Sequence, residues 1–225
     1  PMGRWTPKTI SLHNESKDVP VNSTVLHGHF YYTELAQDFL ERLNKNTLRC
    51  DLVLTTTDED RASLLRDMLQ NYDKGRAEVR VVPNAGRDIG AFLTGLKDIL
   101  SSSYDIIGHI HGKKSLRLNS DGGDTWREFL WEHLVGGRTA AADQCVQALS
   151  EDRKLGVIFP CDANLCGWDE NLTHALEITR QLGRKEPLPE AFEWPIGTMF
   201  WARREALEPL LSLELDWQDY PTEPV

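Results

Sequence analysis

The sequence predicts an α/β fold: one domain with a mainly parallel sheet flanked by helices. Two observations predict it. Short apolar runs rich in Val, Ile and Thr alternate with longer segments whose apolar residues recur at helical spacing. The chain has 225 residues, 40% of them hydrophobic, which is enough for one core. Two neighbouring parallel strands can be joined only by a connection about as long as a helix. The alternation therefore indicates βαβ units with right-handed crossovers.

The first half of the chain shows four strand signals with helical segments between them. The strands are predicted at residues 23–31, at the apolar run of "CDLVLTTTDED" from Cys50, at 77–84 and at 104–111. The helices are predicted at 32–46 behind Thr33 as N-cap, at 61–75 with Gly75 as the stop, and at 91–102.

The second half is less regular. Helices are predicted at 124–136, at 139–152 and within 163–183, a strand at 155–160, and a strand followed by a helix over 196–211, in which Pro209 marks a turn or kink. Residues 1–22 are interpreted as an N-terminal lead or an added segment, and residues 23–225 as the domain, part of a longer chain.

Charge and composition limit the class of partner. The formal net charge is −10, from 35 acidic and 25 Lys and Arg residues, so the surface repels nucleic acid and anionic lipid at long range. The four cysteines lack zinc-site spacing, and no apolar run is long enough for a transmembrane segment or a signal peptide. These features predict a cytoplasmic protein without a nucleic-acid partner, and leave open a peripheral association with the inner face of the membrane.

Four unusual sequences follow the four predicted strands: "HGHF", "TTTD", "NAGRDIG" and "HIHGKKS". Ligands of open parallel sheets bind at the carboxyl ends of the strands, so these sequences predict a shared cleft. In "NAGRDIG", two interpretations stay open. Gly86 and Gly90 permit a tight turn with Asp88 capping a helix, or Arg87 and the start of that helix bind a phosphate.

"HIHGKKS" favours an anion site. His109 and His111 lie two residues apart and project to one side of a strand, while Ile110 points into the core. Lys113 and Lys114 follow in an otherwise acidic chain, which indicates neutralisation of a diphosphate.

Paired imidazoles also bind metals. His27 and His29 form a second His-x-His pair, so a zinc or manganese site is a minority interpretation, although each histidine alone is typical of hydrogen-bonded packing. A zinc hydrolase is disfavoured because no Asp or Glu follows the histidines at ligand spacing.

A family resemblance rests on a series of segments in this order. "VLHGHFYYTELAQDFLERL", "DLVLTTTD", "VRVVPNAGRDIGAFL", "IGHIHGKKS", "WREFLWEHLVGG" and "IGTMFWARREALEPL" resemble the rhamnan synthesis F family of bacterial polysaccharide glycosyltransferases, from about residue 23 to the C-terminus. The resemblance implies a GT-A-like (Rossmann-like) fold and a module of a larger chain that builds O-antigens or rhamnose-containing polymers.

The resemblance also implies the substrates. The donor is expected to be a nucleotide-diphosphate sugar, dTDP-rhamnose, and the acceptor a growing polysaccharide or a lipid-linked sugar. GT-A enzymes usually hold a divalent metal with Asp-x-Asp at the end of the fourth strand, where this chain has His109-Ile110-His111. This departure argues against dependence on Mg²⁺ or Mn²⁺, because hard cations prefer carboxylate oxygens, and lysines supply the same positive charge.

The roles expected for individual residues follow from this comparison. The nucleotide and donor sugar are assigned to His27, Thr56, Thr57, Asp58, Asn84, Gly86, Arg87 and Asp88. The diphosphate is assigned to His109, His111, Lys113, Lys114 and Ser115. The acceptor side is assigned to Gly197 and Thr198. The general base is assigned to Asp219 or Glu223, with Asp162 and Asp169 as alternatives.

Two alternatives stay open. Each candidate base is equally well explained as an exposed surface acid, since the chain has 35 acidic residues. The chain as a whole could also be a non-catalytic GT-A-like module that binds sugar nucleotide or polysaccharide within a larger synthase, because it lacks the carboxylate metal ligands.

Overall fold

The computed structural model describes residues 8–13, 23–112, 120–161, 167–168, 171–190 and 193–221, with the side chains of 120–123 left out. Its centre is a six-stranded sheet in the order β3-β2-β1-β4-β6-β5. The strands are β1 (Thr24–His29), β2 (Asp51–Thr56), β3 (Ala77–Val81), β4 (Ile106–His111), β5 (Val157–Ile158) and β6 (Phe200–Arg203).

The first four strands are mutually parallel, while β6 runs antiparallel to both β4 and β5. The fold is therefore a single α/β domain with a mostly parallel, mixed sheet, and the predicted fold class is confirmed at that level. The position of β6 between β4 and β5 was not predicted.

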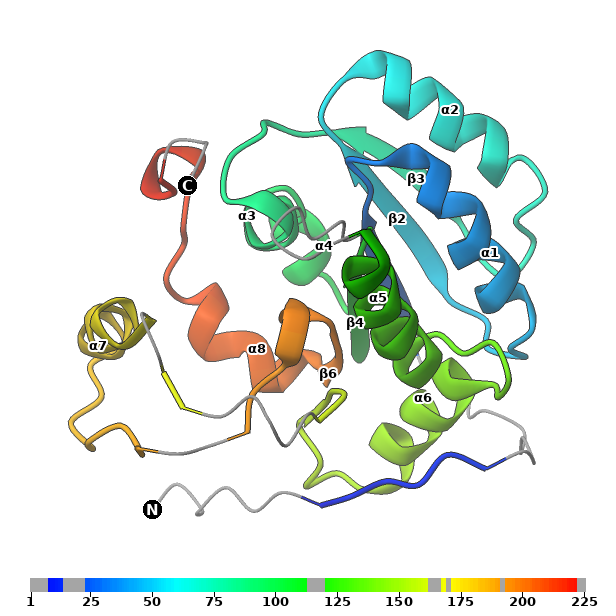
Figure 1. The fold of residues 1–225 in the computed structure, drawn as a ribbon. Coiled ribbons are helices and arrows are strands. Elements are labelled where there is room, and N and C mark those ends of the chain that lie inside the picture. Colours follow the sequence, from blue (N-terminus) through cyan, green and yellow to red (C-terminus); the bar gives the residue numbers. More distant parts are fainter. Residues whose placement is uncertain are drawn as a thin grey trace.

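The helices and 3-10 turns occupy the segments between the strands. They are η1 (Thr33–Leu35), α1 (Ala36–Asn44), α2 (Glu59–Leu69), α3 (Arg87–Leu93), α4 (Lys97–Leu100), α5 (Ser120–Leu134), α6 (Ala141–Glu151), α7 (Leu172–Gln181), η3 (Ile196–Thr198), α8 (Arg204–Leu211) and η4 (Trp217–Asp219). Figure 1 shows the sheet between two groups of helices, with α7 standing apart from it. None of these helices, within the ranges described, has the length and apolar character needed to cross a bilayer.

Several predicted boundaries were wrong. Helix α2 begins two residues early because the Asp58 side chain accepts a hydrogen bond from the Arg61 amide and caps it. It ends at Leu69 rather than at Gly75, which instead packs against the backbone of Cys50. Thr33 is the first residue of η1 rather than a side-chain cap. Pro209 lies within α8.

The predicted helix at 91–102 is two short helices. The first, α3, starts earlier, at Arg87, because Gly86 has a left-handed φ of 66° that turns the chain into the helix. Gly90 has no positive φ. Instead it lets the chain close on itself, since a Cβ there would lie 2.1 Å from the Ala85 carbonyl oxygen.

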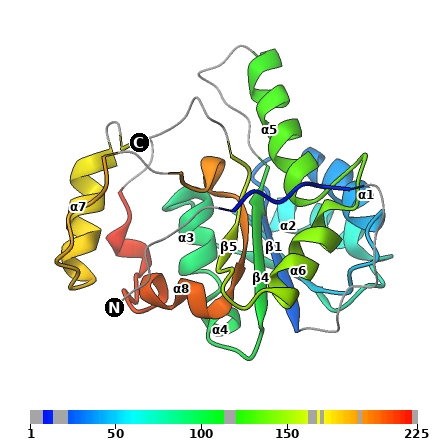
Figure 2. The same ribbon diagram turned by 90° about the horizontal axis from the view of Figure 1, so that it is seen from below.

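The sheet buries a different apolar cluster on each face. One face packs α1, α2, α5 and α6 around residues such as Leu26, Ile110 and Trp131. The other packs α3, α4 and α8 around residues such as Val25, Ile107 and Phe92. Figure 2 shows α3, α4 and α8 on one side of the strands and α1, α2 and α6 on the other. The opposite orientations of Ile110 and its neighbours His109 and His111 are thus confirmed.

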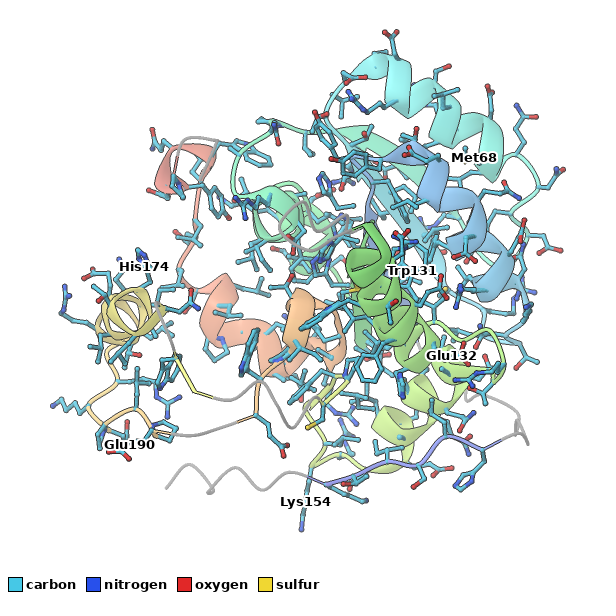
Figure 3. All side chains as sticks on the ribbon, in the orientation of Figure 1. Met68, Trp131, Glu132, Lys154, His174 and Glu190 are labelled. Atoms are coloured by element: carbon cyan, nitrogen blue, oxygen red, sulfur yellow. The ribbon has the colours of Figure 1, made fainter. Side chains whose placement is uncertain are left out.

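Trp131 on α5, labelled in Figure 3, joins the helical layer to β4. Its side chain is fully buried, and its indole Nε1 donates a hydrogen bond to the His111 carbonyl oxygen over 3.3 Å. Trp201 of β6 makes a similar contact, donating to the Leu134 carbonyl over 2.8 Å. Two indoles therefore anchor α5 against the strands that end near His111.

Gly108 makes the junction of β1, β4 and β6 possible. A Cβ at this position would lie 2.6 Å from Cδ1 of Leu26 and 2.7 Å from the Trp201 ring. We predict that Gly108→Ala lowers the free energy of unfolding by about 1–3 kcal/mol, because neither fully buried neighbour has room to withdraw. Urea denaturation measures the loss. The control is Gly156→Ala, whose Cβ would meet only the Ala206 Cβ, at 3.2 Å. Equal losses in the two variants would contradict the packing argument.

Candidate functional site

Four histidines form two adjacent rows on the sheet face that packs against α3. His27 of β1 is the register partner of His109 of β4, and His29 is the partner of His111. On the far side of β1, Thr55 of β2 pairs with His29. All five side chains are buried; His27 and His109 are 1% and 0% exposed, while His29 and His111, at the carboxyl ends of their strands, are each 8% exposed.

Hydrogen bonds join these side chains across three strands. Nδ1 of His27 lies 2.9 Å from Nδ1 of His109, so one ring donates and the other accepts. On its other side, Nε2 of His27 lies 2.8 Å from the Thr55 hydroxyl, which also lies 2.9 Å from Nδ1 of His29. The His27 and His109 rings stack at 5.0 Å, and Phe92 of α3 covers His109 at 4.6 Å.

Asp88, the second residue of α3, points its carboxylate at this cluster. Its Oδ2 lies 3.5 Å from Nε2 of His109 and 3.8 Å from Nε2 of His111, and only 16% of its side chain is exposed. It also accepts a hydrogen bond from the Thr198 hydroxyl. Nε2 of His111 donates to the Gly197 carbonyl over 2.7 Å. Asp88 is thus bound to the sheet rather than capping its own helix.

Two tandem left-handed turns deliver these contacts. Gly86 and Arg87 have φ of 66° and 51°, and Gly197 and Thr198 have φ of 63° and 59°. Positive φ is uncommon for Arg and costly for a β-branched Thr. Such strain persists where the surrounding structure determines it, and both turns here flank the Asp88 carboxylate.

Burial controls the charges of the cluster. It lowers the pKa of His29 to about 4 and the pKa values of His27 and His109 below their usual range, so these three imidazoles are neutral at pH 7. Burial alone would raise the pKa of Asp88. The nearby imidazoles of His111 and His109 and the hydrogen bond from the Thr198 hydroxyl outweigh it and hold that pKa well below its usual value. The cluster therefore holds the Asp88 carboxylate beside the neutral imidazole of His109.

The structure brings together several residues that the sequence singled out. They are His27, Asp88, His109, His111, Gly197 and Thr198, with Gly86 at the turn that aims Asp88. Gly197 and Thr198, expected on the acceptor side, contact the same carboxylate that was expected on the donor side. His109 is enclosed, which argues against the direct contact with a diphosphate expected for it.

Other predicted residues lie at the same edge of the sheet but outside the cluster. The Thr56 hydroxyl donates to the Phe30 carbonyl over 2.8 Å on the opposite face, and Thr57 follows it. Asp58 caps α2, Asn84 is exposed on the connection after β3, and Arg87 is exposed at the start of α3. Their roles in donor binding stay predictions.

The candidate base Asp219 lies in η4, where its carboxylate accepts a hydrogen bond from the Asp216 amide over 2.8 Å. Its neighbour Tyr220 packs on Gly86 and bonds to the Thr94 hydroxyl at 2.9 Å, which brings η4 close to α3. The remaining predicted residues lie outside the described part of the chain: Lys113, Lys114, Ser115, Asp162, Asp169 and Glu223.

Thr55 and the role of Tyr220 were missed. Thr55 stands in a run of three threonines, and strand alternation places it alone on the histidine face, so the period-2 rule could have identified it. His29 was noted as part of a pair but was not assigned a role. No local sequence pattern indicates the packing of Tyr220 on Gly86, because the two residues are 134 positions apart in the sequence.

The described residues do not fit a divalent cation. Across the described ranges, no three His, Cys, Asp or Glu side chains are grouped as metal ligands. The histidine nitrogens face one another or Thr55 instead of a common point, and a hard cation would have only the Asp88 carboxylate. No step below is derived through a metal.

A separate surface hollow of about 600 Å³ lies between α1 and α5, where Arg42 is surrounded by acids that include Glu128 and Glu132. The hollow is built on the opposite face from the histidines and has no strand end in its lining. We therefore place the candidate site at the Asp88 cluster.

Comparison with known proteins places the chain in context. Residues 6–225 match the family described as rhamnan synthesis protein F. Among curated proteins, the uncharacterized protein WxcX from two strains of Xanthomonas campestris pv. campestris is 30% identical over 231 residues, covering 97% of this chain. The alignment covers 32% of WxcX, so the chain spans about a third of the length of these relatives.

The buried imidazoles predict a loss of stability in mild acid. A histidine whose folded pKa is about 4 stays neutral while the unfolded chain, with a pKa near 6.5, takes up a proton, so stability falls as pH drops from 7. For His29 alone the loss between pH 7 and pH 5 is about 2 kcal/mol. Urea denaturation at the two pH values measures it, and His29→Asn should reduce the difference by that amount. A difference that His29→Asn leaves unchanged would contradict this assignment.

Proposed function

The chain belongs to the rhamnan synthesis protein F family, and on that premise we propose that it is a glycosyltransferase of bacterial surface-polysaccharide synthesis. The sugar is rhamnose, the donor a nucleotide-diphosphate sugar such as dTDP-rhamnose, and the acceptor a growing polysaccharide or lipid-linked sugar. The family membership supports a role in polysaccharide biosynthesis. The GT-A-like character of the fold and the transfer itself belong to the proposal.

One observation carries the proposal beyond the family. The Asp88 carboxylate, the His111 imidazole and the Thr198 hydroxyl meet at the carboxyl ends of the parallel strands β1, β2 and β4. This edge is where open parallel sheets bind their ligands. A partly exposed carboxylate with hydroxyl and imidazole neighbours, flanked by two strained turns, is suited to the hydroxyl groups of a sugar.

The diphosphate requires positive charge, which the neutral imidazoles of His27, His29 and His109 do not supply. Lys113 and Lys114 follow β4 in the sequence after Gly112, and Arg87 is exposed at the start of α3 beside Asp88. We assign the diphosphate to these three cations. Thr57, Asp58 and Asn84, on the connections after β2 and β3, would contact the base and ribose.

An inverting transfer also needs a group that deprotonates the acceptor hydroxyl. Asp219 is the described carboxylate predicted for that role, and η4 holds it near α3 through the contacts of Tyr220. Glu223 is the second prediction.

The second candidate is a non-catalytic module that binds a sugar nucleotide or a polysaccharide. The burial of His27 and His109 favours it, because these side chains cannot touch a ligand without rearrangement. Slow hydrolysis of the donor sugar distinguishes the two candidates. Only a transferase activates the anomeric carbon of the donor, so that water can attack it when no acceptor is present.

We predict that Arg87→Ala and Lys114→Ala each weaken binding of a nucleoside diphosphate about tenfold or more. The reason is that a hydrogen bond to a charged group contributes about 1.5–3 kcal/mol. Titration calorimetry with dTDP and UDP measures the affinities, and circular dichroism checks the fold. Arg184→Ala is the matched control, because Arg184 is exposed and follows α7, the helix that stands apart from the sheet in Figure 1. Unchanged affinity in both site variants would contradict the assignment of the diphosphate to this edge of the sheet.

Metal dependence gives a further test. If fixed ammonium and guanidinium groups stabilise the leaving diphosphate, transfer or donor hydrolysis persists in excess EDTA, and added Mn²⁺ changes the rate little. A coupled assay for released nucleoside diphosphate measures both. Complete loss in EDTA with recovery on Mn²⁺ or Zn²⁺ would assign the leaving-group charge to a cation instead.

A further inference from the structure

The hydrogen bonds of the histidine cluster all run in one donor-to-acceptor direction, and Asp88 sets that direction. Nε2 of His109 is sealed from solvent and forms no hydrogen bond of good geometry; the polar atom it faces is Oδ2 of Asp88, 3.5 Å away. A bare ring nitrogen in that position would oppose two lone pairs in a low-dielectric interior, whereas an N–H would meet the carboxylate favourably. His109 therefore carries its proton on Nε2.

The proton on His109 determines the position of the proton on each of the other side chains in the hydrogen-bonded series. Because burial keeps His109 neutral, its Nδ1 is bare and accepts from Nδ1–H of His27, 2.9 Å away. The neutral His27 then has a bare Nε2, which accepts from the Thr55 hydroxyl at 2.8 Å.

The last link reaches the edge of the sheet. The Thr55 hydroxyl donates its hydrogen bond to His27, so its oxygen accepts one from Nδ1–H of His29 at 2.9 Å. His29 is neutral as well, so its Nε2 is bare. No described group bonds to that nitrogen, and it is not among the polar atoms sealed from solvent. A lone pair is thus held at the carboxyl end of β1.

We infer that Asp88, His109, His27, Thr55 and His29 form one oriented hydrogen-bonded chain that makes Nε2 of His29 the proton acceptor for the hydroxyl of the incoming sugar. Asp88 acts as the positioning residue through His109. The inference rests on the proposed sugar transfer and replaces the predicted carboxylate base with an imidazole.

The step balances without a further reactant. The acceptor O–H bond breaks and its proton moves to Nε2 of His29, while the acceptor oxygen forms a bond to the anomeric carbon. The anomeric carbon–oxygen bond breaks, and the nucleoside diphosphate leaves with that electron pair. The His29 imidazolium then releases the proton to solvent, because its pKa of about 4 lies well below pH 7, and the neutral imidazole is restored.

The surroundings of His29 set its basicity. It faces the Thr55 hydroxyl from β2 and the His111 imidazole from β4, and the negative charge of Asp88 on α3 acts on it from the opposite layer. Burial and His111 lower its pKa, Asp88 raises it, and the result of about 4 is close to that of an ordinary carboxylate. At pH 7 the lone pair is therefore available in almost every molecule.

The first experiment tests the orientation without any substrate. Long-range ¹H–¹⁵N correlation spectra distinguish protonated from bare ring nitrogens, and we expect His29 protonated on Nδ1, His27 on Nδ1 and His109 on Nε2. Thr55→Val should abolish the preference of His29, Thr55→Ser should keep it, and Asp88→Asn should weaken it along the whole chain. His29 protonated on Nε2 in the unmodified protein would overturn the inference.

The second experiment measures turnover. His29→Asn keeps a donor toward Thr55 but removes the outward lone pair, so kcat should fall about 100-fold or more with the donor KM nearly unchanged. The control is His174→Asn on α7, which lies apart from the strands and should keep the full rate.

The outcomes separate the two proposals. Full activity of His29→Asn together with loss in Asp219→Asn would overturn the inference and leave the glycosyltransferase intact. If no nucleotide sugar is turned over at all, the transferase proposal fails together with the role of His29 in it, and the tautomers still decide whether the oriented chain exists.

Discussion

The polar architecture depends on one buried negative charge, the carboxylate of Asp88. A charge removed from water is tolerated only when donors replace the lost hydration, and here the Thr198 hydroxyl and the His109 and His111 imidazoles surround it. To bring those donors together, the backbone adopts positive φ at Arg87 and Thr198, at an expected cost of about 1–3 kcal/mol each. The same requirement ties α3 and the turn before β6 to the end of β4.

The same burial keeps His27, His29 and His109 neutral. Their neutrality determines which ligand groups the edge of the sheet can bind. Three imidazoles that are neutral at pH 7 add hydrogen-bonding direction but no positive charge. The cluster is therefore matched to uncharged hydroxyls. The attraction for a diphosphate has to come from side chains outside it, such as Arg87, in a protein whose net charge is −10.

The sequence predicted what depends on local periodicity. Alternating strand and helix signals indicated the parallel β1–β4 sheet, and the two-residue repeat placed His109 and His111 on one face. It could not predict that β6 enters between β4 and β5, because that pairing joins segments about ninety residues apart. The role of Asp88 could not be predicted for a different reason. An acidic residue beside glycine at a helix start has the same local pattern whether it caps the helix or crosses to the sheet, and only the histidines of distant strands decide between them.

The Thr55 hydroxyl between two imidazoles fixes which ring nitrogen is the donor without carrying a charge. A single carboxylate can therefore determine the character of a nitrogen on another strand. Thr55 gives one proton and accepts one, so the donor and acceptor roles fixed at His109 emerge unchanged at His29. A chain ending in water would instead populate both directions, because nothing would distinguish them energetically. The negative charge at one end breaks that symmetry. That charge is held by Asp88 on α3, while the bare nitrogen belongs to His29 at the end of β1, so the stabilised charge and the site of proton transfer lie on different elements.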